Sequence, residues 1–183
     1  RPSERAGAER FPIKAAPPLT PDDANVAPHE PAALPARALS MIDEIRRLTL
    51  DGGPHGFGCV RGVKRVDPDE WFFAAHFFRD PVMPGSLGLE AFIQLLKTYA
   101  RRRWPHLCRS HRFEPIAVGR PVTWKYRGQV IPTNRQITVD AFITAVDESP
   151  TPTVVGRGFL RVDGKTIYEM TDFAIRLVTE DAQ

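Results

Sequence analysis

Between residues 86 and 103, apolar side chains cover most of the circumference of a helix. A helix that is apolar nearly all round is buried inside a domain. The polar exceptions are spaced at i, i+4, i+7 and i+8, so they share one narrow face. They are Glu90, Gln94, Lys97 and Thr98. The pattern predicts one long, buried helix with a single polar stripe.

The rest of the chain from residue 39 onward has the pattern of β-strands. Runs rich in Val, Ile, Thr, Phe and Tyr favour strands, and Asp163-Gly164 between two of them is a typical hairpin turn. One buried helix with several antiparallel strands predicts an α+β domain in which the sheet wraps around that helix. The expected strands lie within residues 41–50, 57–66, 115–127, 134–146, 152–163 and 166–178.

The first 36 residues have a different composition, with eight prolines and many alanines. Proline fixes φ and removes a hydrogen-bond donor, so this stretch is a poor candidate for a helix or a sheet ladder. We therefore expect a Pro/Ala-rich linker or arm over 1–36 and a single folded domain over 37–180. A tail without structure and a tether between domains explain the arm equally well.

Composition excludes several classes of partner. The net charge is only +3, and no dense basic stripe with interleaved aromatic residues indicates nucleic acid. No apolar run reaches the length that crosses a bilayer, so we expect no membrane partner. Cys59 and Cys108 form no disulfide framework and no metal motif. We expect free thiols and a cytoplasmic protein.

Two titratable residues occupy unusual places. His76 lies in an aromatic run, and Glu90 lies within the apolar helix. Either residue alone is easily explained as a satisfied core residue, but Pro81 and Pro84 stiffen the connection between them, and Gly85 permits close backbone approach at the start of the helix. The free N–H groups of a helix start can also stabilise an oxyanion. The spacing of His76, Asp80 and Glu90 matches no metal motif, so we expect no metal.

The connection between these residues resembles a family motif. The segments His76-Phe77, Asp80-Pro81-Val82-Met83-Pro84-Gly85 and Leu87-Gly88-Leu89-Glu90-Ala91, followed by Gln94, are similar to those of bacterial 3-hydroxydecanoyl-ACP dehydratases. The resemblance covers roughly residues 34–178. Two positions depart from it, because Glu90 stands where these enzymes usually carry Asp and Ser86 where they commonly carry Cys. The run Pro84-Gly85-Ser86-Leu87-Gly88-Leu89-Glu90, and the arm before it, look more like dehydratase domains of polyunsaturated fatty acid or polyketide synthases.

The resemblance implies a hot-dog fold that pairs with a second hot-dog domain, so that His76 faces Glu90 of the partner subunit. It also implies dehydration of a 3-hydroxyacyl thioester on an acyl carrier protein to the trans-2-enoyl thioester, without a cofactor. In that chemistry His76 is the base, Glu90 the acid and the Gly85 N–H the oxyanion donor. The expected substrate-binding residues are Phe77, Pro84, Ser86 and Gln94.

Four points stay open. A hot-dog thioesterase would use Glu90 to activate water and would not need His76. A hot-dog half without activity would serve dimerisation or docking, although the presence of both His76 and Glu90 argues against it. Gln94 either orients the Glu90 carboxyl or is only one of the polar residues on this face of the helix. Finally, five basic residues either bind an acidic carrier or are a solvated helix end: Lys97, Arg101, Arg102, Arg103 and Arg109.

Overall fold

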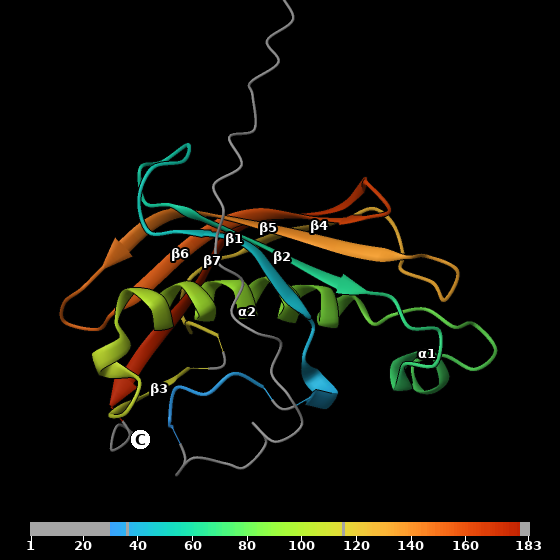
Figure 1. Cartoon of the computed structure of the whole chain (residues 1–183), viewed down its shortest axis with the longest axis horizontal. Coiled ribbons are helices and arrows are strands. Elements are labelled where there is room, and N and C mark those ends of the chain that lie inside the picture. The colour runs from blue at the N-terminus through green and yellow to red at the C-terminus, as the bar shows by residue number, and fades with distance from the viewer. Residues whose placement is uncertain (1–29, 36, 115, 180–183) are drawn as a thin grey trace, which may run out of the picture.

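The computed structural model describes residues 30–35, 37–114 and 116–179, and its main feature is a curved seven-stranded antiparallel sheet (Figure 1). The strand order is β1-β2-β5-β6-β7-β3, and β4 also pairs with β7, along a different stretch from β3. The strands are β1 (Glu44–Thr49), β2 (Cys59–Arg65), β3 (His111–Phe113), β4 (Thr123–Tyr126), β5 (Gln136–Asp147), β6 (Thr153–Val162) and β7 (Lys165–Thr179).

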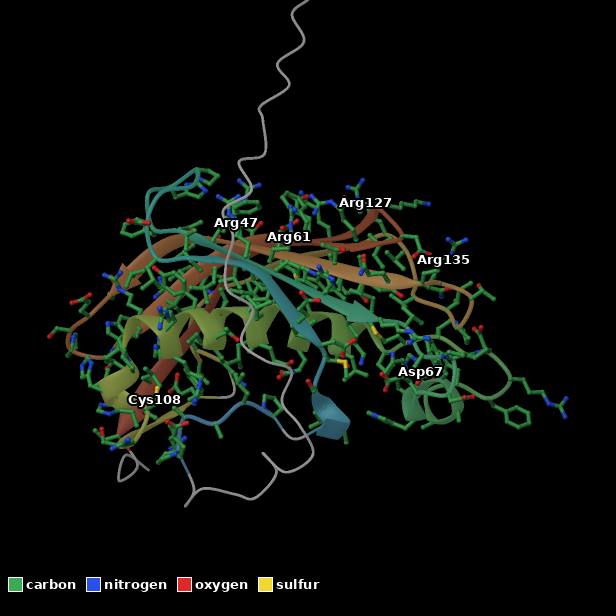
Figure 2. All side chains as sticks on the ribbon, viewed as in Figure 1. Arg47, Arg61, Asp67, Cys108, Arg127 and Arg135 are labelled. Carbon is green, nitrogen blue, oxygen red and sulfur yellow. The ribbon has the colours of Figure 1, made fainter. Side chains whose placement is uncertain are left out.

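The helix α2 (Gly85–Arg103) lies along the concave face of this sheet, as expected (Figure 1), and the side chains of the two layers fill the space between them (Figure 2). Phe92, Leu95 and Leu96 are fully buried there. Glycine in β6 permits the close approach, since a Cβ at Gly158 would lie 2.3 Å from the Phe92 ring. The predicted α+β architecture, with a sheet wrapped around one long helix, is confirmed.

The boundaries of several elements differ from the predicted runs. Of residues 115–127 only Thr123–Tyr126 form a strand, and β3 was not predicted because its three residues are too short to show a periodicity. The aromatic run after residue 70 forms the short helix α1 (Trp71–Ala75). The predicted hairpin turn is confirmed: Asp163 and Gly164 connect β6 to β7 with positive φ values of 49° and 85°.

Two short 3-10 segments, η2 (Arg37–Leu39) and η3 (Pro105–Leu107), flank the helical layer. Most of the predicted arm, residues 1–29 and 36, lies outside the described residues. The last part of the arm contacts the domain. Ala32 is fully buried, and Arg101 of α2 forms an ion pair with Glu30 at 2.6 Å. Within the described ranges no helix is long and apolar enough to span a bilayer.

Candidate active site

Glu90 lies in the second turn of α2, and a quarter of its side chain is exposed. Its Oε1 accepts a hydrogen bond of 3.0 Å from Nε2 of Gln94, one turn further along the helix. The Lys97 ammonium lies 3.9 Å from the same oxygen. Two members of the predicted polar stripe, Gln94 and Lys97, therefore hold the Glu90 carboxyl from one side.

Gln94 is 4% exposed, and its amide is fully used. Its Nε2 also donates to the Leu39 carbonyl at 2.8 Å, and its Oε1 accepts the Met41 N–H at 2.9 Å. The segment before β1 therefore locks the amide in one orientation, with an N–H aimed at Glu90. Of the two interpretations of Gln94, these contacts favour the orienting one.

His76 is the C-cap residue of α1, and its backbone N–H donates to the Phe72 carbonyl. Its ring lies against Phe77, with centroids 4.0 Å apart. Its Nδ1 lies 3.1 Å from the carbonyl oxygen of Val82. A carbonyl oxygen only accepts, so Nδ1 carries the proton in this hydrogen bond. In the neutral ring, Nε2 is then left with its lone pair.

Gly85 is the first residue of α2, directly after the N-cap residue Pro84. Pro84 has no polar side chain that could cap the helix, and its carbonyl accepts the Leu87 N–H at 3.0 Å, so the N–H groups of Gly85 and Ser86 are the ones without an intrahelical acceptor. A side chain at position 85 would collide with the indole of Trp124, because a Cβ would lie 2.8 Å from Cη2. Close packing of the helix start on β4 therefore requires glycine here.

The chain does not bring its two candidate catalytic groups into contact. Glu90, Gln94 and Gly85 share α2, whereas His76 lies on α1, set apart beyond the N-terminal end of α2 (Figure 1). Within the described part of the chain, no hydrogen bond or ion pair links the His76 ring to the Glu90 carboxylate. Among the predicted substrate-binding residues, Phe77 and Ser86 are exposed and Pro84 is half-buried.

Sequence reasoning missed an aromatic surface on β4. Trp124 and Tyr126 are 38% and 44% exposed, and both pack edge-on or tilted against Tyr168 of β7. Burial raises the pKa of the Tyr168 hydroxyl. The signal was present in the alternation Trp124-Lys125-Tyr126, which places both aromatic rings on one face of a strand.

Comparison with known proteins identifies the family. The FabA-like domain matches residues 34–171, most of the folded chain. The chain belongs to the FabA-like hot-dog dehydratase family. A curated relative, one of the subunits of a polyunsaturated fatty acid synthase from Thraustochytrium sp., is 35% identical over 136 residues, which are 72% of this chain. This chain spans only 9% of that relative's length.

Solved structures share the architecture of this FabA-like domain. The dehydratase heterocomplex ApeI:P from Xenorhabdus doucetiae aligns with a TM-score of 0.58 at 7% identity, covering 79% of this chain and 87% of that one. AziG from S. sahachiroi aligns with a TM-score of 0.50 at 9% identity, covering 74% and 90%. At such identities the likeness concerns the fold, and it confirms the expected hot-dog fold.

The basic end of α2 in this FabA-like domain is largely engaged within the chain. Arg101 pairs with Glu30, and Arg103 pairs with Glu148 at 2.9 Å. With Lys97 directed at Glu90, three of the five basic residues considered for docking already have internal roles. Arg102 and Arg109 are the exposed ones that remain.

Proposed function

We propose that this FabA-like domain dehydrates a 3-hydroxyacyl thioester carried on an acyl carrier protein. The hydrogen bond between His76 Nδ1 and the Val82 carbonyl is the observation that carries the proposal. It fixes the tautomer in which Nε2 is a proton acceptor, which is what abstraction of the C2 proton requires. Nε2 lies on a half-exposed ring and has no hydrogen-bond partner among the described residues, so it is available to a substrate.

Glu90 supplies the acid in this proposal. Gln94 occupies Oε1 as a donor, so Oε2 is the oxygen left for the substrate hydroxyl. His76 Nε2 takes the proton from C2, the C2–C3 double bond forms, and the C3–O bond breaks. The protonated Oε2 gives its proton to the departing hydroxyl, and water leaves. The reverse sequence hydrates the trans-2-enoyl thioester.

The start of α2 would stabilise the negative charge that develops on the thioester oxygen. The Gly85 N–H is an outward donor, and the positive end of the helix dipole lies at the same place. Pro84 and Ser86 flank Gly85 in the sequence, and Phe77 follows His76. We propose that these three residues contact the acyl chain.

A second hot-dog domain completes the site in this proposal. Two observations support it. His76 and Glu90 do not meet within one chain, and the edge strand β4 leaves the aromatic side chains of Trp124 and Tyr126 exposed. All four residues of β4 are exposed, and Phe78 beside the candidate base is 87% exposed. An unprotected edge strand with aromatic side chains is typical of a surface that another chain covers. The ApeI:P structure is described as a dehydratase heterocomplex.

The direct test is conversion of a 3-hydroxyacyl carrier substrate, followed by mass spectrometry of the bound acyl group. With the wild-type protein, the carrier-bound acyl group should lose the mass of one water molecule. The His76→Ala variant should turn over roughly 10²–10⁴-fold more slowly while remaining folded by circular dichroism. His106→Ala, which removes an exposed histidine in η3, is the matched control and should retain full activity. Near-normal turnover by His76→Ala overturns the proposal.

A further inference from the structure

Lys64 is a buried lysine that the proposed chemistry does not use. It lies on β2, and its side chain is only 8% exposed. Its ammonium forms an ion pair with Glu70 at 2.6 Å, and Asp43 lies 3.7 Å away. A buried ammonium costs several kcal/mol unless it is paired, so this arrangement is a specific one and not incidental surface polarity.

The carboxylate partner of Lys64 has a defined position in the fold. Glu70 is the N-cap residue of α1, and its side chain is 20% exposed. A helix of five residues does not persist without tertiary contacts. Other contacts of α1 are the buried rings of Phe72 and Phe73 and the bond from Trp71 Nε1 to the Ala38 carbonyl at 2.9 Å. At its C-terminal end, the His76 ring is bonded to the Val82 carbonyl at 3.1 Å.

The same short helix ends at His76. From Glu70 to His76 the helical rise amounts to roughly 9 Å. A tilt of about 6° at the anchored end would therefore displace the imidazole by about 1 Å. Displacements of that size are large for proton transfer, which needs donor and acceptor within hydrogen-bond reach.

We infer that Lys64 is a positioning residue, which fixes the His76 imidazole through Glu70 and the rigid turn of α1. This inference rests on the proposed role of His76. Lys64 touches no reacting atom. Asp43 steadies the pair from the other side, because its second carboxylate oxygen accepts the backbone N–H of Arg65 at 2.7 Å, which fixes Asp43 to β2.

The test compares Lys64→Met with Lys64→Arg and with Lys165→Met, which removes an exposed lysine at the start of β7. Each is assayed below its unfolding transition. Lys64→Met should lower kcat by roughly 10–100-fold and change KM by less than about threefold. Lys64→Arg keeps the positive charge and should retain most of the wild-type kcat. Lys165→Met should behave as wild type.

A second readout does not depend on activity. In imidazole NMR spectra, Lys64→Met should shift or broaden the His76 ring signals and leave those of His55 and His106 unchanged. If Lys64→Met does not fold, Glu70→Gln removes the charge and keeps the side-chain shape, and the same changes are expected with smaller amplitude. Folded Lys64→Met with unchanged His76 signals overturns the inference. An inactive wild type whose His76 signals still respond to Lys64 contradicts the proposed function alone.

Discussion

Replacing Gln94 with leucine should reduce both stability and turnover, because one amide makes three hydrogen bonds. The Met41 N–H belongs to a residue that is 2% exposed, so losing its acceptor costs about 1–3 kcal/mol. Leu39 is 47% exposed, and water can replace the donor to its carbonyl. The bond to the partly exposed Glu90 adds about 1 kcal/mol.

These contributions predict that Gln94→Leu is destabilised by about 2–4 kcal/mol. With a urea m-value of about 2 kcal/mol/M, the unfolding midpoint should fall by about 1–2 M. Turnover of the folded variant should fall by roughly tenfold or more, because the Glu90 carboxyl loses the donor that orients it. Urea titration followed by circular dichroism, and single-turnover dehydration of the carrier substrate, measure the two effects.

Thr98→Val is the matched control on the same helix face. Thr98 Oγ1 donates to the Gln94 carbonyl at 2.7 Å, so valine removes one hydrogen bond without touching Glu90. It should cost about 1 kcal/mol at most and leave turnover unchanged. A Gln94→Leu variant with both the wild-type midpoint and the wild-type rate would contradict the orienting role of Gln94. So would a Thr98→Val variant that slows dehydration as much as Gln94→Leu does.

Three further outcomes are expected. Gly88→Ala would place a Cβ 2.1 Å from the Tyr168 ring, so it should lower the unfolding free energy by about 1–3 kcal/mol in urea titrations, and an unchanged midpoint would contradict the packing of α2 on β7. Hydrogen bonds from Asn134 and two backbone N–H groups hold the Asp163 pKa below its usual value. The ionised carboxylate therefore stabilises the fold at any pH above the unfolded-state pKa, and this stabilisation is lost as the pH falls through the folded-state pKa. Asp163→Asn should accordingly be less stable at pH 7 and approach wild type in acid, and a gap that is independent of pH would contradict this. Incubation with a trans-2-decenoyl carrier substrate should give the 3-hydroxy product with little cis-3-enoyl product, and chromatographic accumulation of the latter at a rate comparable to hydration would contradict the interpretation of Glu90.

The fold could be predicted because its strongest determinants are local. The nearly continuous apolar surface around residues 86–103 allowed only a buried helix, and the Asp163-Gly164 turn has the φ angles that its residue types favour. By contrast, α1 has five residues and no periodicity that could be recognised, and it exists because Phe72 and Phe73 find a core to enter. Its tertiary environment decides its conformation.

The individual residues of the site could be predicted from the sequence, but their arrangement in space could not. His76 and Glu90 stand out by type and by place, yet the tautomer of His76 depends on the Val82 carbonyl. The role of Gln94 depends on Met41, 53 positions earlier in the chain. Lys64 looks like an ordinary strand residue until Glu70 is brought against it. Contacts of this kind arise only when the chain is folded, and single-sequence patterns do not report them.

The proposed dehydratase site joins His76 of one hot-dog domain to Glu90 of another. The most direct measurement mixes His76→Ala with Glu90→Ala chains, each inactive alone, after subunit exchange has been demonstrated with differently tagged chains. With equal amounts of the two chains, half of the resulting dimers should be mixed, each with one intact site of two. About a quarter of the wild-type dehydration rate should therefore be recovered. Complete exchange without recovered activity would contradict it.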